Sequence, residues 1–149
     1  PLGTVNARKV ENADWDEDRF LDYARKQGRP LFGVDIRVRD EQGRDIAHDG
    51  VAFGELEVRG PWIAAAYFNK PGDPAHTADG WFRTGDVVTV DELGCIEIVD
   101  RAKDVIKSGG EWISSITLEN VIMGHPDVAM AAVIAMHHPK WDERPLLLV

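Results

Sequence analysis

The most informative parts of the chain are two polar stretches, which read WFRTGD at residues 81–86 and DRAKDVIKSGGEWIS at residues 100–114. Both stretches are rich in charged residues and glycine, and both lie between apolar segments with the character of strands. Charged groups between buried strands are costly unless they meet water or a ligand. The two stretches therefore indicate where strands are interrupted and where a ligand would bind.

Upstream of residue 100 the sequence predicts a small antiparallel β assembly. Alternating apolar and charged residues, or apolar runs, predict strands at residues 32–39, 53–58, 81–90 and 95–99. Asp-Glu-Leu-Gly at 91–94 predicts the turn of a hairpin. A helix is expected before these strands, capped by Asp14 or Asp16 and stopped by Gly28 and Pro30.

Downstream of Asp100 the pattern changes. Residues 105–113 predict a hairpin that turns at Gly109 and Gly110, and Ser114 is placed to cap a helix that ends near Gly124. A strand is expected at 128–136. The sequence therefore predicts an α+β chain, with an antiparallel β-rich subdomain in residues 1–100, a boundary at 101–103, and the start of a small α+β domain in 104–149.

Composition narrows the class of partner. The 149 residues are 44% hydrophobic with a formal net charge of -9, which argues against nucleic acid and anionic membranes. The one cysteine, Cys95, fits a reducing compartment, and no apolar run has the length of a membrane span. We expect a cytoplasmic protein, which could lie at a membrane surface. The histidines lack metal-binding spacing, so no metal site is expected here.

The two ends predict an internal piece of a longer protein. The chain opens Pro-Leu-Gly without an initiator Met, and it closes on the apolar run 146–149, which is typical of a buried strand without its partners.

The stretches 81–86 and 100–114 together resemble the nucleotide-binding and hinge segments of the adenylate-forming enzymes, and most closely the medium- or long-chain fatty acyl-CoA synthetases. The resemblance covers nearly the whole chain. It implies that residues 1–100 end the large N-terminal domain, as its distorted β-barrel part, that 101–103 form a hinge, and that 104–149 begin the small C-terminal domain.

The resemblance implies roles for residues that also have ordinary structural interpretations. Asp86, otherwise a turn residue beside a glycine, matches the Asp that binds the ribose hydroxyls of ATP. Arg101 matches an Arg beside the nucleotide, and Lys103 matches the pivot of the small domain, although both also suit a solvated loop.

Four residues of the glycine turn match the segment that faces CoA in the family: Gly109, Gly110, Glu111 and Trp112. Glycine also simply favours a hairpin turn, and Trp112 is as consistent with domain packing as with ligand contact.

The resemblance implies ATP, Mg²⁺, CoA and a fatty acid as ligands of the parent enzyme. It also implies that the phosphate loop, the acyl pocket and a Thr-Glu pair for magnesium lie upstream of this chain. The catalytic Lys would lie beyond Val149, so no catalytic residue is expected here. The oligomeric state is not indicated.

Other functions are compatible with the same motifs. The alternatives within the family are an aryl-CoA ligase, a luciferase-like enzyme and a peptide-synthetase adenylation domain. A noncatalytic binding module is the alternative from another class.

Overall fold

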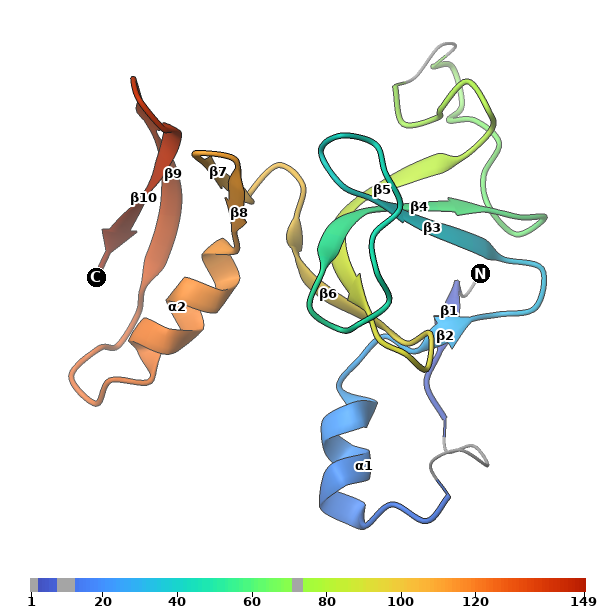
Figure 1. Cartoon of the computed structure of the whole chain (residues 1–149), viewed down its shortest axis with the longest axis horizontal. Helices are drawn as coiled ribbons and strands as arrows, with labels where there is room; N and C mark the ends of the chain where they lie inside the picture. The colour runs from blue at the N-terminus through green and yellow to red at the C-terminus, as the bar shows by residue number, and fades with distance from the viewer. Residues whose placement is uncertain (1–2, 8–12, 71–73) are drawn as a thin grey trace. The chain divides into compact units, whose positions relative to one another are not determined.

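The computed structural model describes residues 3–7, 13–70 and 74–149. The chain divides into two compact units, Pro1–Ile98 and Val99–Val149, and each combines antiparallel strands with one helix (Figure 1). The predicted α+β class is confirmed. In the described residues no helix is long and apolar enough to cross a membrane.

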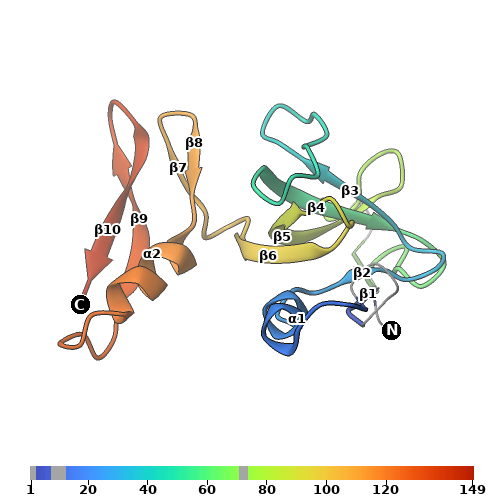
Figure 2. The same ribbon diagram turned by 60° about the horizontal axis from the view of Figure 1, so that its bottom comes forward.

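The first unit is organised around a four-stranded sheet in the order β3-β4-β5-β6 (Figure 2). Its strands are β3 (Asp35–Arg39), β4 (Phe53–Arg59), β5 (Phe82–Val90) and β6 (Ile96–Arg101). The pairing of β3 with β4 and of β4 with β5 is antiparallel. A separate short pair joins β1 (Thr4–Val5) to β2 (Arg29–Pro30).

The alternation of side chains gives this sheet one apolar face and one charged face. Val38 lies opposite Leu56 on the apolar face, whereas Arg37 lies opposite Glu57 on the other. The apolar face carries the hydrophobic core of the unit, which consists of the buried residues Val38, Leu56, Val88, Val90 and Ile96. Exclusion of these side chains from water is the main force that holds the sheet together.

Helix α1 (Glu17–Ala24) of the first unit begins where the sequence predicts. Asp16, and not Asp14, caps it, because its carboxylate accepts a hydrogen bond of 2.8 Å from the backbone N–H of Arg19. Gly28 follows with a φ of +89°, and a Cβ there would lie 2.2 Å from the backbone of Val5. Only glycine fits this close crossing of the chain.

The second unit is a four-stranded sheet in the order β8-β7-β10-β9 with one helix. Its elements are β7 (Ile106–Ser108), β8 (Glu111–Ile113), α2 (Ser115–Met123), β9 (Ala132–His138) and β10 (Asp142–Leu148). Figures 1 and 2 both show α2 lying along β9. Ser114 caps α2 as predicted, since its hydroxyl accepts a hydrogen bond from the N–H of Thr117.

Two of the predicted strands begin three or four residues later in the structure than the sequence indicated. The strand expected from residue 32 begins at Asp35, because Gly33 adopts a φ of +82° in a turn. The strand expected at 128–136 begins at Ala132, since the N–H of Val128 closes a turn onto His125.

The final apolar run was predicted to be a buried strand without partners, and this is wrong. Residues 146–148 belong to β10, which pairs with β9 along its whole length. Its leucines, Leu146, Leu147 and Leu148, are 37%, 40% and 50% exposed.

The predicted turn at 91–94 is held by the carboxylate of Asp91. One oxygen accepts hydrogen bonds from the N–H groups of Leu93 and Cys95, and the other lies 2.9 Å from the Lys26 ammonium. Burial acts to raise the pKa of Asp91, but the hydrogen bonds from Lys26 and the two N–H groups outweigh it and lower that pKa below its ordinary value of 3.8.

The substitution Asp91→Asn tests this arrangement. The amide oxygen still accepts the N–H groups, but the charge facing Lys26 is lost, so we expect a loss of about 1 kcal/mol of unfolding free energy at pH 7. Because the pKa of Asp91 is lowered on folding, its stabilisation is fully present above pH 3.8 and is lost as the pH falls through the lowered pKa. Urea unfolding at pH 7 and at pH 2 should show a difference between variant and wild type that shrinks in acid. A pH-independent difference would contradict the prediction.

Candidate functional site

The Arg-Thr-Gly-Asp motif forms a bulge inside β5, whereas the sequence suggested a turn at Gly85 and Asp86. Glu57 pairs with Arg83 and Glu55 pairs with Val87, so Thr84, Gly85 and Asp86 all face the single residue Leu56. Gly85 takes a φ of +76°, which an L side chain rarely adopts. Bulges redirect side chains at functional sites. Asp86 lies in this bulge, outside the regular pairing of β4 with β5.

The hydroxyl of Thr84 bridges the bulge. It donates a hydrogen bond of 3.2 Å to the carbonyl of Leu56 on β4, and it accepts one of 3.1 Å from the N–H of Asp86. Thr84 and Asp86 are both half-buried, whereas Gly85 between them is exposed. The carboxylate of Asp86 is therefore carried by a backbone that is tied to the neighbouring strand.

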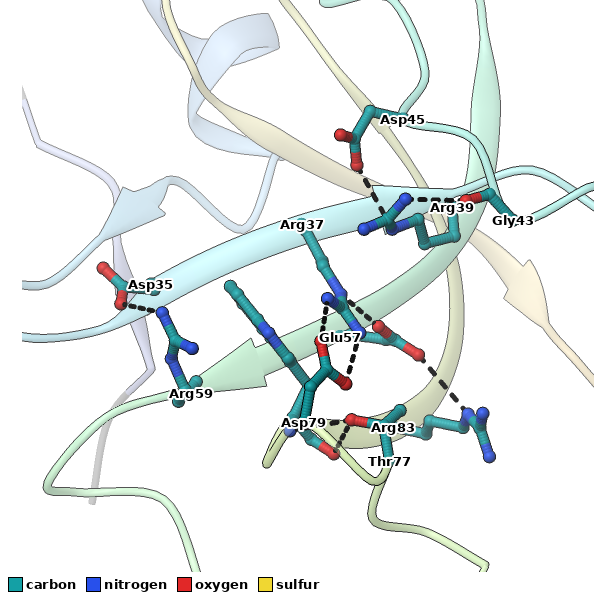
Figure 3. A network of polar contacts seen from close by, with 11 residues as sticks. Asp35, Arg37, Arg39, Gly43, Asp45, Glu57, Arg59, Thr77, Asp79 and Arg83 are labelled. Carbon is teal, nitrogen blue, oxygen red and sulfur yellow. Dashed lines mark hydrogen bonds and ion pairs between the residues drawn. The ribbon is translucent and has the colours of Figure 1, made fainter.

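A buried carboxylate next to the bulge links three strands (Figure 3). Glu57, which is 6% exposed, accepts a hydrogen bond from Arg37 on β3 through one oxygen. Its other oxygen lies 3.3 Å from Nε of Arg83 on β5. A charge with so little solvent requires such partners, and Glu57 fixes the strand register immediately before the bulge.

Two arginines also stack on the ring of Trp81, the residue before β5. The guanidinium groups of Arg37 and Arg59 lie 4.5 Å and 4.4 Å from the ring centroid. Arg37 makes two further hydrogen bonds of 2.7 Å and 3.2 Å to Asp79, and these hold the pKa of the Asp79 carboxyl below its usual range (Figure 3). The charged face of the sheet thus carries a network of paired groups.

A hollow of about 330 Å³ lies beside this network. Its lining includes Arg59, Ile63, Ala64, His76, Thr77 and Phe82. His76 shares a hydrogen bond of 2.8 Å with the carbonyl of Ala64, and Asp86 does not line the hollow. We assign it no ligand.

In the second unit, Arg101 and Lys103 lie where β6 ends. Arg101 is the last residue of β6, and its carbonyl accepts hydrogen bonds from the N–H groups of Asp104 and Val105. The side chain of Lys103 is 81% exposed, with Asp104 3.9 Å away. The two compact units divide between Ile98 and Val99, and the hinge role of residues 101–103 stays a prediction.

Asp100 ties the end of β6 to the start of α2. Its buried carboxylate accepts hydrogen bonds from the N–H of Arg101, and from both the N–H and the hydroxyl of Ser115, at 2.7 to 3.1 Å. The hydroxyl of Ser114 adds a bond of 3.0 Å to the carbonyl of Val99. Segments on both sides of Lys103 are therefore joined.

Gly109 and Gly110 form the turn between β7 and β8, as predicted, with φ values of +62° and +88°. A Cβ on Gly109 would lie 2.7 Å from the ring of Trp141, whereas a Cβ on Gly110 would meet nothing within 4 Å. The close neighbour of Gly109 is thus part of the chain itself. Gly110 leaves open space beside its backbone.

Glu111 and Trp112 begin β8, directly after this turn. Glu111 is exposed and pairs with Ser108 across the hairpin. Trp112 is half-buried, and the Lys107 ammonium lies 5.0 Å from its ring centroid. Asp86 belongs to the first unit, and the other predicted site residues belong to the second. The described part of the chain gathers no group of three or more His, Cys, Asp or Glu that could hold a metal ion.

Several curated proteins match this chain over 99–100% of its length. It is 50% identical over 148 residues to a 3-methylmercaptopropionyl-CoA ligase of Ruegeria lacuscaerulensis. This alignment covers 99% of the chain and 27% of that relative. It is 47% identical over 149 residues to a medium-chain-fatty-acid–CoA ligase of Ectopseudomonas oleovorans, with the same coverage. A long-chain-fatty-acid–CoA ligase of Thermus thermophilus is 49% identical over 151 residues, 100% of the chain and 28% of the relative. No protein-family model matches.

Solved structures show the same relationship. The o-succinylbenzoate CoA synthetase of Bacillus subtilis, in complex with its acyl-adenylate intermediate, superposes with a TM-score of 0.71 at 32% identity, over 87% of this chain and 26% of that one. ATP-bound MatB from Rhodopseudomonas palustris gives a TM-score of 0.70 at 31% identity, over 83% and 25%.

The chain therefore belongs to the adenylate-forming enzymes. Within them it is homologous to one region of the acyl-CoA ligases, and it spans about a quarter of the length of the curated relatives that it matches.

Four structural roles near the predicted site were not anticipated from the sequence: those of Glu57, Thr84, Asp100 and Trp141. The alternation in residues 53–58 is consistent with Glu57 on the polar face of a strand. It does not predict that Glu57 lies between Arg37 and Arg83. Asp100 and Thr84 stand inside the quoted motifs, yet their partners are distant in sequence. Nothing in the sequence links Trp141 to Gly109.

The two glycines of the turn predict unequal sensitivity to substitution. Gly110→Ala should cost about 1 kcal/mol, since it only places a side chain at positive φ. Gly109→Ala should cost about 1–3 kcal/mol more, because its methyl group also overlaps the Trp141 ring. Chemical unfolding of both variants measures the difference, with Gly110→Ala as the matched control. Equal losses of unfolding free energy in the two variants would show that overlap with the Trp141 ring does not contribute to the cost at Gly109.

Proposed function

We propose that this chain is part of an ATP-dependent acyl-CoA synthetase that activates a fatty acid as acyl-AMP and passes the acyl group to CoA. The observation that carries the proposal is the β5 bulge bearing Asp86, in a chain 47–50% identical to proteins named as CoA ligases. We expect the protein to be cytoplasmic.

The reaction has two steps. A carboxylate oxygen of the acid attacks the α-phosphorus of ATP, and pyrophosphate leaves. The CoA thiol, losing its proton, then attacks the acyl carbon, and AMP leaves as the thioester forms. Magnesium would offset the phosphate charge in the first step. The family resemblance implies that a Thr-Glu pair upstream of this chain would help to hold it.

Asp86 is the residue that we assign to the ribose of ATP. An ionised carboxylate offers only acceptors, and two vicinal hydroxyls offer two donors, so one side chain can hold the diol. Arg101, at the exposed end of β6, supplies a cation for the nucleotide.

Lys103 is the proposed pivot about which the second unit rotates between the two steps. Its side chain is largely exposed, so it loses little packing when its backbone torsions change. Rotation would bring Gly109, Gly110, Glu111 and Trp112 to the CoA arm. Gly110 is the better candidate for close passage of pantetheine, because the space beside it is open.

The identity of the acid is a finer proposal than the reaction. The relatives are named for 3-methylmercaptopropionyl, medium-chain and long-chain acyl groups, which are all aliphatic. Aryl acids are represented by a trans-cinnamate:CoA ligase of Petunia hybrida at a lower identity, 40%. Thioester formation by the full-length protein with aliphatic acids of several lengths and with cinnamate tests the assignment. A protein that forms no thioester and no acyl-AMP would be a noncatalytic module.

Replacement of Asp86 tests the nucleotide site. In the full-length protein, Asp86→Ala should weaken ATP binding by about 1–3 kcal/mol, the range for hydrogen bonds to a charged group. Titration of ATP against the folded variant measures the loss. The matched control is Glu92→Ala, an exposed carboxylate in the β5–β6 turn, which should bind ATP as the wild type does. An unchanged affinity in Asp86→Ala would contradict the ribose assignment.

Proline at the pivot tests the hinge. Proline fixes φ near -65°, so Lys103→Pro should restrict the second unit to one orientation. We expect the two half-reactions, followed as ATP–pyrophosphate exchange and as thioester formation from supplied acyl-AMP, to fall unequally. Lys103→Ala removes the charge but leaves the backbone free, and should affect both steps alike. Equal losses in a Lys103→Pro variant of normal stability would make residue 103 an ordinary linker position.

A further inference from the structure

The bulge in β5 is flanked on both sides by paired residues, so its conformation depends on residues 84–86 alone. Before it, Arg83 pairs with Glu57 in the ladder and by an ion pair of 3.3 Å. After it, Val87 pairs with Glu55 and is completely buried. The direction of Asp86 is therefore decided within residues 84–86 and by what holds them.

Inside the bulge, the glycine cannot hold the shape by itself. Gly85 has a wide choice of backbone conformations, and its φ of +76° is one of several that a glycine adopts readily. Regular pairing is interrupted here, because three residues face Leu56 alone. The bulge needs a further restraint to keep one conformation.

The hydroxyl of Thr84 supplies that restraint. It donates to the Leu56 carbonyl at 3.2 Å and accepts the Asp86 N–H at 3.1 Å, so one oxygen joins the facing strand to the residue that carries the carboxylate. Threonine is also stiff at χ1, which keeps this oxygen in place. Valine has the same shape but can make neither bond, and would leave both backbone groups without this partner.

We propose that Thr84 is a positioning residue for the nucleotide: through its hydroxyl it fixes the Asp86 backbone, and thereby aims the Asp86 carboxylate at the ribose hydroxyls. This inference rests on the ribose role proposed above for Asp86. The role assigned to Thr84 requires no contact of its own with the nucleotide or the reacting atoms. Loss of the Thr84 hydroxyl should reduce the preference for ATP over its deoxy analogues without abolishing it.

The test compares ATP with 2′-deoxy-ATP and 3′-deoxy-ATP in pyrophosphate exchange by the full-length protein. The measured quantity is the ratio of kcat/KM for ATP to that for each deoxy analogue. Wild type should prefer ATP, and Asp86→Ala should bring the ratio close to 1. Thr84→Val should lower the ratio by about threefold to tenfold, as expected for partial loss of one or two hydrogen bonds.

Three further variants sharpen the test. Thr84→Ser keeps the hydroxyl and should restore the ratio to within about twofold of wild type. Thr89→Val removes a hydroxyl elsewhere in β5 and should leave the ratio unchanged, whatever it does to stability. If Thr84→Val does not accumulate as folded protein, Thr84→Ala removes the same hydroxyl with less apolar bulk.

The outcomes separate the inference from the proposed function. If Asp86→Ala abolishes the ATP preference and the hydroxyl-free variants at residue 84 keep the wild-type ratio, Thr84 has only a structural role, and the inference is overturned while the ribose site stands. If wild type shows no preference, or if Asp86→Ala keeps it, the ribose assignment and the inference fall together. A lowered ratio in Thr84→Val that Thr84→Ser restores supports both.

Discussion

Each unit of this protein depends on one buried carboxylate placed where regular backbone pairing stops. Glu57 lies beside the bulge of the first unit and binds two arginines from the flanking strands. Asp100 lies at the end of β6 and binds three donors at and beyond that end. A buried charge is tolerated only with such a full set of partners. The bonds of these two carboxylates therefore reach the backbone and side chains next to the irregular segments that carry the predicted site residues.

The bulge preserves the two-faced character of the sheet because it adds an even number of residues. From Glu55 to Glu57 the chain advances by two residues on β4, while from Arg83 to Val87 it advances by four on β5. An odd insertion would exchange the apolar and charged faces beyond it. With two extra residues, Val88 and Val90 return to the core cluster. The chain can thus present Asp86 without disturbing its hydrophobic interior.

The sequence predicted the parts of this structure that depend on short-range patterns. The helix capped at Asp16, the turn at 91–94, the glycine turn of 109–110 and the cap at Ser114 follow from neighbouring residues, and all of them are present.

The features it did not predict depend on contacts between distant residues. The motif at 83–86 looks like a turn in sequence, and only the pairing of β4 with β5 makes it a bulge. The partners of β10 and the Trp141 ring against Gly109 are likewise set by tertiary packing. Recognition of the family came from the identity of a few motif residues, which carry chemistry and not fold.

The bonds of Asp100 have a mechanical consequence for the segment around Lys103. They close residues 100–115 into a ring through hydrogen bonds, with Lys103 inside it. A torsion in a closed ring cannot turn alone: either other torsions compensate or the ring opens. A turn at Lys103 therefore requires either compensating torsions elsewhere in residues 100–115 or the loss of the bonds to Ser115. The carboxylate of Asp100 thus couples the backbone torsions at Lys103 to those of the glycine turn and of the start of α2.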